Sequence, residues 1–232
     1  MIYEIGGGTG VYCIEGAGPR VYYVAYPEPM LIDTGGPGQT EIVLRALAQI
    51  GVQPISIRRI VLTHHHLGHV GGVAELKRRS GANVYAHVAD IPYISGRLRR
   101  RAPRNRVERV LNSAVAWTGV MDVPPARIEK PVDEGMVVNG WQILHTPGHT
   151  PGHICLLRDR MLISGDLLQA SAGGFREMSL SSIADIPASR ASIAKIANLS
   201  FDAILSAHHA PYVMNANGKV QELAARLDRS VD

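Results

Sequence analysis

Histidine is concentrated in three short segments of this chain. Nine of the ten histidines lie in them: His64, His65, His66 and His69; His145, His149 and His153; and His208 and His209. A neutral imidazole is the commonest side-chain metal ligand near neutral pH. Asp166, in Ser164-Gly165-Asp166, adds a carboxylate oxygen between the second and third clusters. The sequence therefore predicts a metal site assembled from distant loops.

The first cluster follows the β-branched segment Arg59–Leu62, which we expect to be a strand. Residues two apart on an extended segment point the same way, so His64 and His66 could bind one ion. His69 is expected at the start of a helix that runs to about Arg79. The positive end of that helix would favour the neutral ring that a metal requires.

The elements that must position these clusters are predicted from periodicity and turn residues. We expect strands at Val11–Ile14, Val21–Ala25, Met30–Ile32, Asn83–Ala86, Trp141–Leu144, His153–Leu157, Met161–Ile163 and Ala203–Leu205. We expect further helices at Thr40–Ile50 and at about 104–117, 189–199 and 219–230.

Each half of the chain thus runs from strands to a histidine-bearing loop and then to a helix. Two such halves, packed sheet against sheet with helices outside, predict an α/β fold of the α+β type, a four-layer αββα sandwich. No low-complexity linker separates the halves. We therefore expect one domain over residues 1–232, with an Arg-rich helical insertion at about 93–118.

Charge is concentrated in residues 97–109, which carry a net +6 within a chain of net +4. This segment could bind an anionic substrate, with Arg99, Arg100 and Arg101 as candidate contacts, or it could be a solvated surface. No secretory signal and no stretch of roughly 18 apolar residues is visible, so a cytoplasmic protein without a membrane segment is expected. The two cysteines, Cys13 and Cys155, are expected as reduced thiols, with one disulfide as the alternative.

Several motifs together resemble the metallo-β-lactamase-fold hydrolase superfamily, and the resemblance runs nearly end to end. That family carries D-T-G, T-H-x-H-x-D-H, T-P-G-H-T-P-G, G-D and a late histidine, in this order. The corresponding segments here are Asp33-Thr34-Gly35, Thr63–His69, Thr146–Gly152, Gly165-Asp166 and His208. The αββα fold that the resemblance implies agrees with the two-half interpretation above.

The resemblance implies a set of ligands, residue by residue. His64, His66 and His149 would bind a first metal, Asp166 would bridge to a second, and His69 and His208 would complete the second site. Asp33 matches a buried carboxylate that supports the metal loops. The resemblance implies zinc, as one or two ions, with iron or manganese as alternatives. His145 and His153 flank His149 without a ligand role, His208 is preferred to His209, and His65 and His87 receive no role.

One position departs from the family pattern. Gly68 stands where the family has an aspartate that ligates the second metal. Three protein ligands and a water still suffice for a catalytic zinc, but the second site would lose a negative charge. A mononuclear enzyme, a different metal and an impaired hydrolase all follow as alternatives.

The function implied is hydrolysis by water that the metal activates, with no side-chain nucleophile. A small-molecule substrate with an ester-type bond is expected, first a thioester such as hydroxyacylglutathione and then a lactone. The alternatives are phosphodiester cleavage and metal binding with little catalysis. A β-lactam is the least expected substrate, and nucleic acid is not expected as a partner.

Overall fold

The computed structural model describes residues 1–98 and 123–229, and the chain divides into two compact units. The first unit is Met1–Val132 and the second is Asp133–Asp232. Each contains its own sheet, its own helices and its own apolar core.

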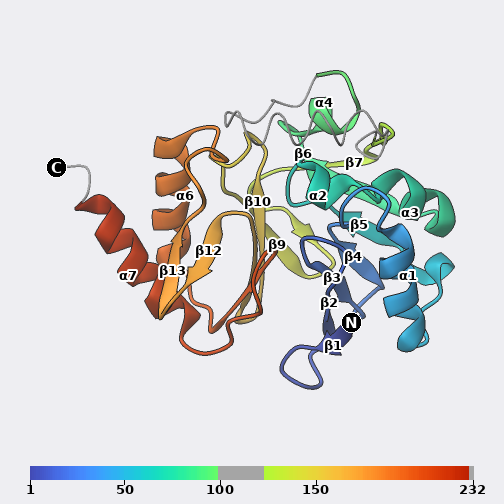
Figure 1. Cartoon of the computed structure of the whole chain (residues 1–232), viewed down its shortest axis with the longest axis horizontal. Helices are drawn as coiled ribbons and strands as arrows, with labels where there is room; N and C mark the ends of the chain where they lie inside the picture. The colour runs from blue at the N-terminus through green and yellow to red at the C-terminus, as the bar shows by residue number, and fades with distance from the viewer. Residues whose placement is uncertain (99–122, 230–232) are drawn as a thin grey trace. The chain divides into compact units, whose positions relative to one another are not determined.

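The first unit is built on a seven-stranded sheet whose strands follow one another in chain order. Its strands are β1 (Ile2–Glu4), β2 (Val11–Ile14), β3 (Val21–Val24), β4 (Met30–Ile32), β5 (Arg59–Val61), β6 (Asn83–His87) and β7 (Lys130–Val132). β1 to β4 pair antiparallel, and β4 to β7 pair parallel (Figure 1). Parallel pairing requires crossover connections, and the three connections between β4 and β7 carry the helices of this unit.

These helices are α1 (Thr40–Gln49), η1 (Pro54–Ser56), α2 (Leu67–Val70), α3 (Val73–Ser80) and α4 (Ile91–Ile94). In α1 the buried apolar residues recur at helical spacing, at Val43, Leu44 and Leu47. They share one core with Ile60 of β5 and Leu76 of α3. The parallel strands and their crossover helices therefore hold the loop that follows β5.

The helix expected from His69 to Arg79 is interrupted. It forms as α2 and α3, with Gly71 and Gly72 between them. A side chain at Gly71 would place its Cβ 2.2 Å from the backbone of Gly36 and Pro37. This close approach of two loops is a tertiary contact that periodicity alone does not reveal.

The second unit has a five-stranded sheet in the order β14-β11-β10-β9-β8 and a separate two-stranded hairpin. The sheet consists of β8 (Val137–Val138), β9 (Trp141–His145), β10 (Ile154–Arg158), β11 (Met161–Gly165) and β14 (Ala203–Ser206). The hairpin consists of β12 (Leu168–Ser171) and β13 (Gly174–Glu177). β8 to β11 pair antiparallel, whereas β11 and β14 pair parallel.

Two helices, α6 (Ile186–Ala197) and α7 (Ala216–Asp228), complete this unit. Ile193 of α6 and Leu223 of α7 share an apolar core with Leu144 and Ile204 of the sheet. The helix expected at 189–199 begins earlier because the Asp185 carboxylate caps it by accepting the Ala188 N–H.

The predicted α/β class is confirmed, since each unit combines a sheet with helices. The prediction of one domain over 1–232 stays a prediction. The helix expected at about 104–117 and most of the insertion expected at about 93–118 lie outside the described residues. Within the described part of the chain, no helix is long and apolar enough to cross a membrane.

Candidate metal centre

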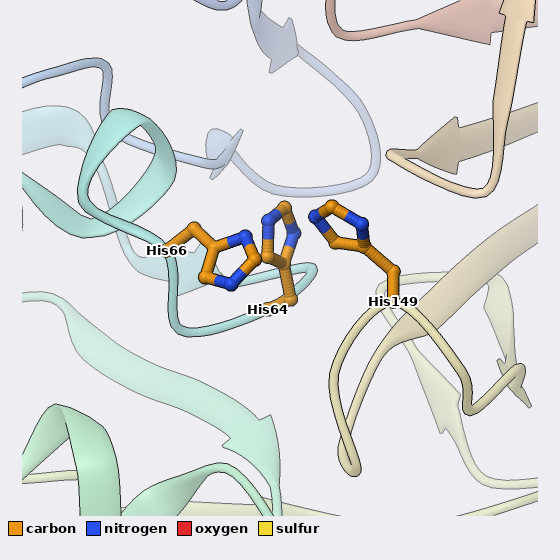
Figure 2. A group of neighbouring side chains, drawn as sticks. All are labelled: His64, His66 and His149. Atoms are coloured by element: carbon orange, nitrogen blue, oxygen red, sulfur yellow. The ribbon is translucent and has the colours of Figure 1, made fainter. Parts of the chain in front are cut away.

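The first unit brings three of the predicted ligands together. His64 and His66 lie on the loop after β5, and His69 lies in α2. The His64 ring centroid is 4.8 Å from that of His66 and 4.0 Å from that of His69. Figure 2 shows the His64 and His66 rings side by side on this loop, and it also draws His149, which belongs to the second unit.

Asp33 connects this loop to β4. Its Oδ1 accepts the Thr63 backbone N–H at 2.8 Å, and its Oδ2 accepts the Thr63 hydroxyl at 2.8 Å. The same Oδ2 lies 2.7 Å from Nδ1 of His69. Asp33 is 3% exposed and has a left-handed backbone with φ of 61°. Asp33 is thus a buried carboxylate that contacts Thr63 and His69, and its role in supporting a metal site stays a prediction.

The same hydrogen bonds indicate which ring nitrogen of His64 and of His69 would bind a metal ion. Because the Thr63 hydroxyl donates to Asp33, its oxygen accepts from Nδ1 of His64, 3.1 Å away. Nδ1 of His69 likewise donates to Asp33. The lone pair of each neutral ring then lies on Nε2, so Nε2 is the nitrogen that would ligate a metal.

His69 is the third residue of α2, so a helix begins near it as expected, although this helix has only four residues, Leu67–Val70. The contact with Asp33 orients the His69 ring.

His65 makes contacts outside the cluster. Its backbone N–H donates to Oδ2 of Asp90 at 2.9 Å, and its Nδ1 lies 3.1 Å from the same oxygen. Its ring stacks on Tyr93 at 4.3 Å between centroids. Asp90 precedes α4 and is 1% exposed. Sequence reasoning missed Asp90 and Tyr93, because no motif marks them.

The second unit gathers the remaining predicted ligands around Asp166, which follows β11. Oδ2 of Asp166 lies 3.4 Å from Nε2 of His149 and 3.1 Å from Nε2 of His208. Asp166 and His149 are buried, whereas His208 is exposed. Two imidazole nitrogens thus converge on one buried carboxylate oxygen.

The loop that carries His149 is held to the start of α6. The Gly148 carbonyl accepts the backbone N–H groups of Ala184 and Asp185 at 2.8 and 2.9 Å. Gly148 has φ of 135°, and a Cβ there would lie 2.3 Å from the Ser189 backbone nitrogen. Only glycine fits this approach, which accounts for the glycine in the T-P-G-H segment.

His145 and His153, the two neighbours of His149, contact backbone groups. His145 Nε2 donates to the Pro151 carbonyl at 2.9 Å, and His153 Nε2 accepts the Asp166 N–H at 3.1 Å. His87 Nδ1, in the first unit, accepts the Ala89 N–H at 3.2 Å.

Gly68, the departure from the motif, lies against Pro19 within the first unit. A Cβ at position 68 would be 2.7 Å from Cγ and 3.1 Å from Cδ of Pro19. The chain is therefore packed around a glycine here. The other speculative residues, Arg99, Arg100 and Arg101, lie outside the described residues.

The donor set fits a divalent transition metal. Imidazole nitrogens with one carboxylate oxygen suit zinc and iron, and an oxygen donor also suits manganese. Burying a charged carboxylate costs free energy unless an opposite charge or hydrogen bonds compensate for it. A cation beside Asp166 would provide such a charge.

Comparison with known proteins agrees with the fold. Residues 28–208 match the metallo-β-lactamase superfamily, and the chain belongs to this superfamily. The probable metallo-hydrolase YflN of Bacillus subtilis is 27% identical over 230 residues, which are 90% of this chain and 87% of that protein. A hydroxyacylglutathione hydrolase of Xanthomonas euvesicatoria is 30% identical over 57% of this chain, and the chain spans 40% of that protein's length.

Solved structures show the same fold. A metallo-β-lactamase of Cronobacter sakazakii, a HARLDQ-motif mutant, superposes with a TM-score of 0.72 at 20% identity, over 100% of this chain and 96% of that one. TTHA1623, solved in a di-iron-bound form, superposes with a TM-score of 0.66 at 30% identity, over 87% of this chain and 93% of that one. The metallo-β-lactamase fold is thereby established, and family and donor groups together imply divalent metal ions.

Proposed function

We propose that this protein is a metal-dependent hydrolase of a small ester-type bond, with thioesters as the first substrate class and lactones as the second. His64, His66 and His149 would hold one divalent ion. Asp166 would bridge to a second ion held by His69 and His208. The observation that carries the proposal is the convergence of His149 and His208 on one buried oxygen of Asp166.

Two residues, Asp33 and Thr63, orient the histidine rings that would bind the metal. Asp33 and Thr63 hold His64 and His69 with Nδ1 protonated, which orients Nε2 for ligation. A bound divalent ion supplies Lewis acidity that activates water and polarises a carbonyl near neutral pH. The thioester class is supported by the relatives named hydroxyacylglutathione hydrolase, although the matched part is less than half of their length.

A second candidate is a metal-binding protein with weak hydrolysis. The packing of Pro19 against Gly68 favours it, since the usual aspartate has no room there without a shift of Pro19. Its second metal would then bind more weakly than the first.

Metal analysis of the purified protein, together with hydrolysis of thioesters, lactones, phosphodiesters and β-lactams, tests the proposal. His149→Ala should lose metal and activity. His145→Ala is the matched control: it removes a neighbouring ring that contacts the Pro151 carbonyl, and it should keep both. Thioester turnover that disappears only in His149→Ala supports the proposal. Full metal content without turnover of any substrate supports the second candidate, and unchanged metal in His149→Ala overturns the ligand assignment.

A further inference from the structure

His153 is fully buried beside the candidate metal centre, and its ring nitrogens contact the Thr146 hydroxyl and the Asp166 backbone N–H. It immediately precedes β10. Its backbone carbonyl accepts the Thr146 N–H at 2.9 Å, which extends the pairing of β9 with β10 by one residue pair. This pairing places the Thr146 hydroxyl 2.9 Å from Nδ1 of His153.

The other ring nitrogen determines the tautomer of His153. The Asp166 backbone N–H can only donate, so Nε2 of His153, 3.1 Å away, accepts. Nδ1 of the neutral ring therefore carries the proton and donates to the Thr146 hydroxyl oxygen.

Two further contacts link the Thr146 hydroxyl, through Cys155, to the backbone of Ser164. The Thr146 hydroxyl lies 3.4 Å from Sγ of Cys155, and that thiol donates to the Ser164 carbonyl at 3.6 Å. A carbonyl can only accept, so the Cys155 proton points to Ser164. The Thr146 hydroxyl then donates toward the Cys155 sulfur at 3.4 Å and the His153 carbonyl at 3.5 Å. Burial raises the pKa of Cys155 to about 12, so this thiol keeps its proton at neutral pH.

These contacts form a directed series that begins and ends on one short segment. It starts at the Asp166 N–H, passes through His153, Thr146 and Cys155, and ends at the Ser164 carbonyl. The segment between its ends is irregular: Gly165 has φ of 49°, and the pairing of β11 with β14 shifts register there. An irregular backbone that carries a functional side chain must be held by its surroundings.

We propose that the series formed by His153, Thr146 and Cys155 is a positioning device for Asp166. It holds the backbone of Ser164–Asp166 so that the Asp166 carboxylate faces His149 and His208. This inference rests on the proposed function, because Asp166 acts as a metal ligand in it. None of the three residues is itself a ligand or a catalytic residue.

The test is the affinity for zinc, measured by titration against a competing chelator. Thr146→Val removes the hydroxyl but keeps the branched shape, whereas Thr146→Ser keeps the hydroxyl. Loss of a supporting contact lowers metal affinity by about 10–100-fold, which is the loss expected for Thr146→Val. Thr146→Ser should bind zinc nearly as tightly as the unmodified protein.

A control separates positioning from general destabilisation. Ser80→Ala removes a buried hydroxyl that bonds to the Leu76 carbonyl in α3 of the first unit. It should lower the melting temperature of the metal-free protein but leave zinc affinity unchanged. Should Thr146→Val not fold, Cys155→Ala and Cys155→Ser form a second pair, because serine retains a donor to the Ser164 carbonyl.

Unmodified protein and His149→Ala are titrated in the same experiment, so that the two proposals fail differently. Equal zinc binding by these two proteins overturns the proposed metal site. If His149→Ala loses zinc but Thr146→Val binds it as tightly as Thr146→Ser does, the positioning role alone is overturned. A specific loss in Thr146→Val, restored in Thr146→Ser, supports that role.

Discussion

Nδ1 of His69 lies 2.7 Å from Oδ2 of Asp33, a residue 36 positions earlier in the chain. Both side chains are buried. Asp33 directly follows β4, and His69 lies in α2, which follows β5. Because β4 and β5 pair parallel, the loops after these two strands lie at the same edge of the sheet. The carboxylate thereby holds the His69 ring in one tautomer and one orientation.

Asp33→Asn should therefore weaken zinc binding by about 10–100-fold, because the amide keeps the shape but loses the negative charge that the His69 proton faces. Asparagine tolerates the left-handed backbone at position 33, so the fold should survive. Zinc titration against a chelator, with melting temperatures of the metal-free proteins, measures both effects. Unchanged zinc affinity in a folded Asp33→Asn protein would contradict the supporting role.

A carboxylate at position 68 should fit best when Pro19 is changed as well. Gly68→Asp alone places its Cβ 2.7 Å from the Pro19 ring, so the new side chain must displace that ring. Pro19→Ala removes Cγ and Cδ, the two atoms in the way. We expect the double variant to bind a second zinc more tightly than Pro19→Ala does, and Gly68→Asp alone to gain less. Equal second-site affinity in the double variant and Pro19→Ala would show that a carboxylate at 68 does not reach the metal.

Gly148→Ala should disturb the His149 loop. Its new Cβ would lie 2.3 Å from the Ser189 backbone, and overpacking of this kind costs about 1–3 kcal/mol in addition to the strain of a positive φ. Gly173→Ala is the matched control, since Gly173 also has a positive φ but no atom within 4 Å of the place that its new methyl group would take. Both variants should lower the urea midpoint, but only Gly148→Ala should lower zinc affinity. Similar zinc loss in both would point to strain rather than to the His149 loop.

Alkaline pH should destabilise the metal-free protein partly through Cys155. Burial raises the pKa of this thiol to about 12, whereas an unfolded cysteine titrates near 8.5. The native state thus favours the protonated thiol: its contribution to stability is complete below about pH 8.5 and is lost as the pH rises toward 12. At pH 10.5 the lost stability is on the order of 3 kcal/mol.

Urea unfolding of the metal-free protein at pH 8 and pH 10.5 measures this loss. Cys155→Ala should show a smaller fall in stability between the two pH values, because every other titrating group is the same in both proteins. Iodoacetamide should not label Cys155 in the native protein at pH 8. An identical fall in the free energy of unfolding in both proteins would mean that the Cys155 thiol does not stay protonated in the folded state.

Much of the fold was predictable because it is encoded locally. The amphipathic period of α1 and the apolar segments that became β2 and β4 lie where the sequence indicated. The histidine clusters and the order of the motifs predicted the superfamily, since metal ligands require specific residue types at short spacings.

What each histidine contacts depended on the tertiary structure. Nothing in the local sequence distinguishes His65 and His153 from their neighbours by function, because their partners Asp90 and Asp166 are 25 and 13 residues away. Such contacts between distant residues depend on how the strands pair and on the geometry of the loops. The division between α2 and α3 arises in the same way, from the approach of Gly71 to the Gly36–Pro37 backbone. Residue types at short spacing were enough to predict a metal site; the folded backbone alone decided which side chains lie beside the candidate ligands and contact them.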